Sequence, residues 1–240
     1  MSNFLRPLQC VEKNYKHRRI LINMRTSQLI QTLFLLSVTA FTLLMLTKVV
    51  PYLSFEPEID FLTTKTDRVL ARQDFQFSFY IHIVSSLWTM GIGIPQFIPS
   101  LVKKYPLLHQ TLGKIYVFSI LFLAAPSGLG LAIYANGGLP AKVGFSLQCV
   151  VWWLATWVAW REIQKKRWQT HIEWMMRSYA VTLAAMSLRV GSYAMVYFFH
   201  TKPIETYLTV TWLSWVGNLV IVEGLIYVGM SERLLKALKK

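Results

Sequence analysis

Six long apolar stretches dominate this chain of 240 residues. They cover residues 29–49, 77–101, 110–135, 143–160, 173–198 and 206–230. A helix needs about 20 mostly apolar residues to cross the hydrocarbon core of a bilayer, and each stretch approaches or exceeds that length. Together they use most of the chain and leave no room for a separate soluble domain. The sequence therefore predicts an all-α integral membrane protein, a bundle of six transmembrane helices.

Basic residues are distributed unevenly between the two sides of this predicted bundle. Of the 25 Lys and Arg, 17 fall in the two tails and in the connections on the same side, and six fall on the other side. Lys and Arg of short loops collect on the cytoplasmic face. We therefore expect an N-in, C-in, multi-pass protein of the inner (cytoplasmic) membrane. The net charge of +14 then reflects topology and contact with anionic lipid, not nucleic-acid binding.

This pattern divides the chain into a basic cytoplasmic tail (1–28), a transmembrane domain (29–231) with an outer loop at 50–76, and a basic C-terminal tail (232–240). The first stretch lacks the short basic start and small-residue cleavage site of a signal peptide, so we expect a retained helix. Only Cys10 and Cys149 are present. Two cysteines so placed predict neither a disulfide framework nor a Cys-based zinc or iron–sulfur site.

The second stretch has a polar face. At 100° per residue, one side of a helix there collects His82, Ser85, Ser86, Thr89, Gly93 and Gln96. This side is expected to face the interior of the bundle. Proline removes a backbone hydrogen bond, so Pro95, Pro99 and Pro126 predict kinks in the second and third helices.

The fifth stretch has a comparable face. The same arithmetic from His171 collects Met175, Ser178, Thr182, Ala185 and Arg189. Arg189 follows His171 by five whole turns, so both are expected to face the interior if the helix is straight.

Depth in the membrane groups these residues into two predicted sites. His109 and His171 open their helices at the inner surface, whereas His82 and Arg189 lie in the outer half. Histidines at helix ends also serve as caps or interfacial residues. As a facing pair, His109 and His171 predict a ligand that neutral imidazoles bind: a haem iron, a divalent metal or a quinone head group.

Arg189 needs an oxygen partner, because a guanidinium at this depth costs about 2.5–3.5 kcal/mol on insertion scales. Glu223 is expected to lie about 13 Å away in depth, too far for a direct salt bridge. The partners expected instead are a haem propionate, a substrate anion, or backbone and Asn218 oxygens.

Four stretches resemble a family of uncharacterised bacterial membrane proteins, the domain of unknown function 2306. They are "HQTLGKIY", "APSGL", "GGLPAKVGF" and "HIEWMMRSYAVTLAAMSLR", and the resemblance covers roughly residues 77–200. The first departs from the H-R-x-x-G-R pattern of the family, because Gln110 and Lys114 replace its arginines. The resemblance implies a membrane protein and directs attention to His82, His109, His171 and Arg189. It implies no reaction.

These observations lead to one hypothesis and two alternatives. The hypothesis is a redox protein that passes electrons to or from a quinone or a membrane partner, with haem b held by His109 and His171 as iron ligands. His82 and Arg189 would then form a polar site for a propionate, a quinone carbonyl or a proton relay. The alternatives are a transporter or small-molecule binding protein anchored by Arg189, and an accessory or assembly subunit without chemistry of its own.

Overall fold

The computed structural model describes residues 29–56 and 58–239 of the chain. Contacts divide the chain into two compact units, and the boundary in the sequence falls between Phe41 and Thr42. Within the first unit, residues 29–41 are described and form a helix. The basic tail predicted for residues 1–28 lies outside the described residues.

The second unit is built from helices. The helix that reaches residue 49 is followed by η1 (Val50–Ser54), η2 (Leu62–Thr64), α2 (Asp67–Leu70), α3 (Gln73–Gln96), α4 (Pro99–Lys104), α5 (Pro106–Phe118), η3 (Ser119–Ala124), α6 (Ala125–Ala132), α7 (Gly138–Gln164), α8 (Trp168–Thr182), α9 (Ala184–Phe199), α10 (Pro203–Tyr227) and α11 (Met230–Lys239). Among the described residues, five helices are long and apolar enough to span a membrane. The bent pair α8–α9 makes a sixth candidate. The predicted all-α membrane fold is confirmed.

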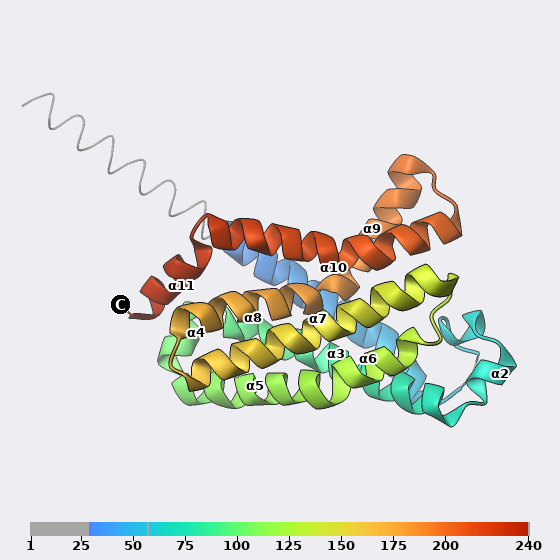
Figure 1. Ribbon diagram of the computed structural model, residues 1–240, viewed down its shortest axis with the longest axis horizontal. Helices are drawn as coiled ribbons and strands as arrows, with labels where there is room; N and C mark the ends of the chain where they lie inside the picture. Colours follow the sequence, from blue (N-terminus) through green and yellow to red (C-terminus); the bar gives the residue numbers. More distant parts are fainter. Residues whose placement is uncertain (1–28, 57, 240) are drawn as a thin grey trace, which may run out of the picture. The chain divides into compact units, whose positions relative to one another are not determined.

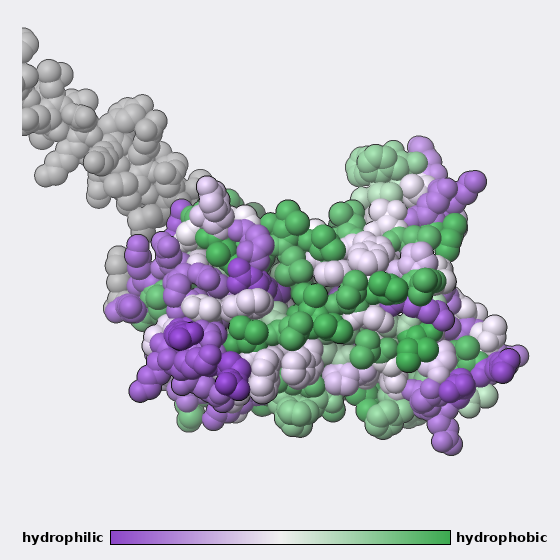
Figure 2. Space-filling view, viewed as in Figure 1, coloured by the Kyte–Doolittle hydropathy of each residue, from purple (hydrophilic) through white to green (hydrophobic). Residues whose placement is uncertain are grey.

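Within the second unit, α3, α5, α6, α7 and α8 pack along one another, and α10 packs on α7, α8 and α9 (Figure 1). One end carries α4, α11 and the α7–α8 turn, and we call it the basic end. The opposite end carries η1, η2 and α2, and we call it the loop end. Hydrophilic residues gather near both ends, with more apolar surface between them (Figure 2). A bilayer covers such a surface with its hydrocarbon core along the apolar part.

Proline acts differently in the two helices for which kinks were predicted. Helix α3 ends at Gln96 and α4 begins at Pro99, so the second span stops short of the predicted residue 101. In the third span, the π-helical segment η3 precedes Pro126, and the span continues from Pro106 to Ala132. Pro126 cannot donate to Leu121, five residues earlier. Trp153 Nε1 donates to that carbonyl at 3.1 Å instead.

The fifth span is not the straight helix that the sequence predicted. It breaks between Thr182 and Ala184, and the two halves differ in direction by 46°. A break leaves carbonyls without their usual donors. Asn218 of α10 donates from Nδ2 to the carbonyl of Ala180 at 2.9 Å and accepts from Ser187 Oγ at 2.7 Å. Contacts from another helix therefore stabilise the bend.

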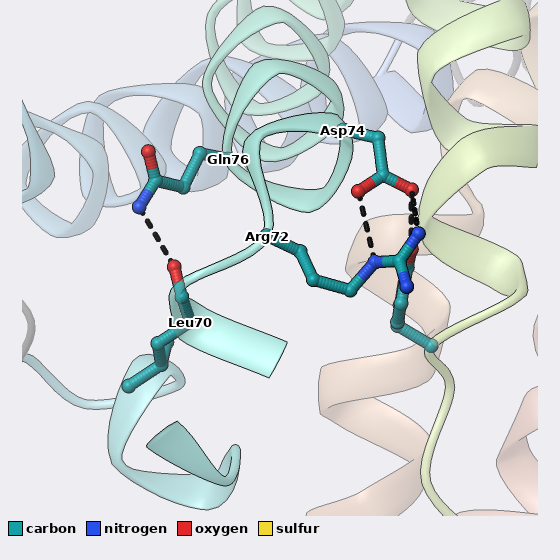
Figure 3. A network of polar contacts seen from close by, with 5 residues as sticks. Leu70, Arg72, Asp74 and Gln76 are labelled. Carbon is teal, nitrogen blue, oxygen red and sulfur yellow. Dashed lines mark hydrogen bonds and ion pairs between the residues drawn. The ribbon is translucent and has the colours of Figure 1, made fainter. Parts of the chain in front are cut away.

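Polar contacts hold the outer loop against the bundle at the loop end. Arg72 donates from Nε and Nη2 to the two carboxylate oxygens of Asp74 at 3.0 and 3.2 Å, and Gln76 donates to the carbonyl of Leu70 at 2.7 Å (Figure 3). Tyr134 also donates to Asp74, and this hydrogen bond raises the pKa of Tyr134. These contacts fix the loop at the start of α3.

Candidate functional site

His109 and His171 lie at the basic end, in the first turns of α5 and α8. The two rings are close enough to interact electrostatically. His171 donates from Nδ1 to the carbonyl of Ala159 at 2.8 Å, which leaves Nε2 as the nitrogen with a free lone pair. Nδ1 of His109 is buried and has no hydrogen-bond partner among the described residues. The pair therefore offers nitrogen atoms that the protein does not use itself.

Small and polar groups lie beside His109. Gly113 lies one turn beyond His109 on α5, and a Cβ there would meet only Gln96 Oε1, at 3.7 Å. Gln96 comes from the last turn of α3, on the polar face that the sequence predicted to point inward. Ser85, Thr89 and Gly93 of that face are buried, as expected.

A buried network of hydroxyl groups lies two helical turns further into the bundle. Tyr116 Oη makes hydrogen bonds with Ser178 Oγ at 3.0 Å and Thr182 Oγ1 at 2.9 Å. From α7, Trp152 Nε1 donates to Thr182 Oγ1 at 3.0 Å, and Thr156 Oγ1 pairs with Ser178 Oγ at 2.7 Å. The sequence placed Ser178 and Thr182 on the inward face. It did not indicate this network, although Tyr116 and Ser178 each follow a predicted site histidine by seven residues.

His82 of α3 is held firmly against the third span. Its Nδ1 donates to the carbonyl of Ala124 at 2.9 Å, and Ser86 Oγ lies 3.4 Å from its Nε2. A Cβ at Gly128 would lie 2.8 Å from the ring, so the histidine packs directly against the backbone there. His82 thus has a structural role in helix packing, whatever else it does.

Arg189 is the predicted site residue that the structure places least as expected. The span bends by 46° at Leu183, so Arg189 does not continue the straight helix of His171, and its side chain is exposed on α9. Its Nη1 donates to the carbonyl of Ala185, in its own helix, at 3.0 Å. No hydrogen bond or ion pair among the described residues joins it to His82. The site shared by His82 and Arg189 stays a prediction without a contact to support it.

Glu223 does not pair with Arg189, in agreement with the predicted difference in depth. Arg177 of α8 donates to both Glu223 oxygens, from Nε at 2.6 Å and from Nη2 at 2.9 Å. The Arg177 guanidinium also lies 4.7 Å from the centre of the Trp174 ring. This two-pronged ion pair links α8 to α10 within the membrane-spanning part of the chain.

The described residues contain no group of three or more His, Cys, Asp or Glu side chains that could hold a metal ion. The histidine pair suits ligands that need two imidazoles and no further protein ligand. A haem iron, whose other four ligands come from the porphyrin, is one. A quinone head group, whose oxygens take hydrogen bonds, is another.

Comparisons with known proteins agree with the membrane fold and supply a family. Residues 79–226 match the family described as predicted membrane protein (DUF2306), which is more than half of the chain. No curated protein and no solved structure matches. The match includes both histidines of the pair, His82 and Arg189. The chain therefore belongs to the DUF2306 family of predicted membrane proteins.

Proposed function

We propose that this protein is a redox protein of the inner membrane whose His109–His171 pair binds haem b and passes electrons to or from a quinone or a partner subunit. The observation that carries the proposal is the buried Nδ1 of His109, which has no hydrogen-bond partner among the described residues and lies within electrostatic reach of His171. A buried polar atom without a partner costs about 1–3 kcal/mol, which a bound group would relieve.

One histidine of the pair has the hydrogen bond that is usual for a haem ligand. Iron-ligating histidines usually donate their other ring nitrogen to a carbonyl or carboxylate, which fixes the ring and the tautomer. His171 does this through Ala159, at 2.8 Å. Bound haem supplies reversible one-electron transfer. The protein contributes two neutral imidazoles and, in Gly113, a helix surface without a side chain next to His109.

A quinone is the alternative ligand for the same pair. Its two carbonyl oxygens accept hydrogen bonds, and the corresponding hydroxyl groups donate them, so either imidazole could serve in either state. Gln96, whose Oε1 lies near Gly113, adds a further polar group at this end.

The first test is a dithionite-reduced minus oxidised visible spectrum of the detergent-purified protein, with a pyridine haemochrome assay on the same sample. A stoichiometric b-type signal is expected, lost in both His109→Ala and His171→Ala. The control is His200→Ala, which changes an exposed histidine beyond the end of α9. A full signal in both site variants would remove the ligand assignment.

If the reduced minus oxidised spectrum shows no haem signal after expression with ample haem, the next test is for a bound quinone. Organic extraction of the purified protein should then yield a stoichiometric quinone from the wild type and the His200→Ala control, but not from His171→Ala. If neither haem nor quinone accompanies the protein, the redox proposal fails.

The proposal includes the N-in, C-in orientation, which places the histidine pair near the cytoplasm. Its support is the excess of Lys and Arg at the basic end, including Lys103, Lys104, Lys165, Lys166 and Arg167. A green fluorescent protein fused to the C-terminus should fluoresce, and an alkaline phosphatase fused there should be inactive. The reverse result would invert the orientation.

A second candidate function is a transporter or binding protein for a small anion, with Arg189 as its anchor. Two observations favour it: the fifth span is broken, as in many transporters, and Arg189 bonds only to its own helix among the described residues. Native mass spectrometry should then show a bound small anion in the wild type and in Arg189→Lys, but not in Arg189→Gln. Retention of that anion by Arg189→Gln would exclude Arg189 as the anchor.

A further inference from the structure

Helix α11 has two different faces. It follows Gly229, whose φ of +79° turns the chain sharply after α10. On a helical projection, Arg233, Lys236 and Lys239 fall within about 120° of one another, with Leu234, Leu235 and Leu238 on the other side. The three basic side chains are exposed, and the three leucines are half-buried. This is the pattern of a helix that lies in the surface of a membrane.

Specific contacts hold α11 on the bundle. Ser231 is fully buried, accepts a hydrogen bond from Gln169 Nε2 at 2.7 Å and donates to Glu173 Oε1 at 3.3 Å. Gln169 and Glu173 come from the first turns of α8, on either side of His171 in sequence. The helix also packs against α4. Its position is thus set by the protein, and its basic face keeps a fixed direction.

Helix α4 adds to the same charged surface. Lys103 and Lys104 form its last turn, and both are exposed. Among the described residues, these two lysines form no ion pair. The three basic residues of α11 form none either. Five cations without carboxylate partners therefore lie on two helices that pack against each other at the basic end.

We propose that α11 and α4 together form a binding surface for the phosphate groups of anionic phospholipids. The half-buried leucines would lie at the boundary with the acyl chains, and the lysines and Arg233 would meet the head groups. Each Lys or Arg near an anionic membrane surface adds to the attraction, and a cluster of four to eight is typical of lipid recognition. The inference does not depend on haem, quinone or anion binding elsewhere in the protein.

The test compares anionic and zwitterionic lipid on the full-length, detergent-purified protein. Native mass spectrometry with dioleoyl phosphatidylglycerol or dioleoyl phosphatidylcholine should show preferential retention of the anionic lipid. The variant Arg233→Gln/Lys236→Gln/Lys239→Gln should reduce that preference by about tenfold or more. The control is Lys48→Gln/Arg68→Gln/Lys142→Gln, which removes three exposed cations at or near the loop end and should retain the preference. Thermal unfolding without added lipid checks that both variants fold.

Two results with these variants would overturn the proposal, and a third comes from a competition experiment. Undiminished preference in the α11 variant, or an equal loss in the control, would show that this surface does not select the lipid. A second arm uses inorganic phosphate as competitor. If millimolar phosphate displaces the lipid from the wild type, the surface is a general anion site and not a lipid site.

Discussion

The two halves of the fifth span, α8 and α9, have similar lengths but very different surroundings. Seven of the 15 residues of α8 are buried, whereas only Ala184 is buried among the 16 of α9. Helix α8 packs against α7 and α10 and carries hydroxyl groups that bond to its neighbours. Helix α9 packs mainly against α10 and exposes large aromatic side chains, including Tyr193, Tyr197 and Phe199.

The comparison shows how differently one span can use the same kind of polar residue. Arg177 of α8 has a carboxylate partner from the chain, and Arg189 of α9 bonds only to a backbone carbonyl among the described residues. The α8 half thus belongs to the packed interior. The α9 half leaves its arginine and its large aromatic side chains exposed. Exposed apolar surface in a membrane protein is ordinary, but an exposed arginine at this depth is not.

The largest expected effect comes from filling the contact between α3 and α8. In Gly93→Ala, the new Cβ would lie 2.1 Å from Tyr179 Cε2, and the Tyr179 hydroxyl is held by the carbonyl of Met90 at 3.1 Å. We expect a loss of about 3 kcal/mol in stability, measured by thermal or denaturant unfolding in detergent. Gly191→Ala is the matched change in α9, where the nearest atom, of Val210, lies at 3.4 Å. Equal losses in both variants would contradict the contrast.

A smaller effect is expected from breaking the ion pair between α8 and α10. Arg177→Gln leaves Glu223 without its partner. Because this carboxylate is partly exposed, the cost should fall between those of surface and buried pairs, at about 2 kcal/mol. The double variant Arg177→Gln/Glu223→Gln should recover part of that loss in the same unfolding assay. Additive losses in the double variant would show that the pair is not coupled.

Removing one hydroxyl from the buried network should cost less. Tyr116→Phe keeps the ring and deletes the hydrogen bonds to Ser178 and Thr182. Intramembrane hydrogen bonds between side chains contribute about 0.6 kcal/mol on average, with a maximum near 1.7 kcal/mol, and the loss should lie in that range. Tyr193→Phe in α9 changes an exposed ring and should leave the unfolding midpoint unchanged. A larger loss for Tyr193→Phe would reverse the assignment of core and surface.

The smallest effect on stability is expected at Arg189. Arg189→Gln removes a charge that forms no ion pair among the described residues, so stability in detergent should change by less than about 0.5 kcal/mol. Any loss of a bound anion in this variant would then report on binding and not on folding. A loss as large as that of Arg177→Gln would indicate a partner within the chain.

The sequence predicted the spans because length and hydropathy are local properties. The predicted spans agree with the observed helices apart from shifts of a few residues at their ends. The second span, for example, begins at Gln73 and not at residue 77, since its polar first turn extends beyond the apolar stretch. The inward face of α3 and the first half of the inward face of the fifth span were also predicted. Both follow from a regular helix of 3.6 residues per turn.

The bend at Leu183 could not be predicted in the same way. No proline or glycine marks it. The carbonyl of Ala180 is satisfied by Asn218, 38 residues further along the chain. The partners of the hydroxyl network likewise come from α7, so they appear only when the helices are packed. The sequence therefore predicts least well the surroundings of residues whose position depends on a straight helix, above all Arg189.

The π-helical segment η3 also determines which sequence changes the third span can tolerate. Such a segment holds one residue more than an α-helix would need over the same turn. A deletion of one residue within Ser119–Ala124 would let the same turn close with α-helical winding, so the residues after it would keep their angular position relative to α5. The backbone at Gly128 would then stay against the ring of His82. A deletion in a regular α-helical part of the span would instead rotate everything after it by about 100°. The third span can therefore lose a residue at η3 more easily than in its regular turns.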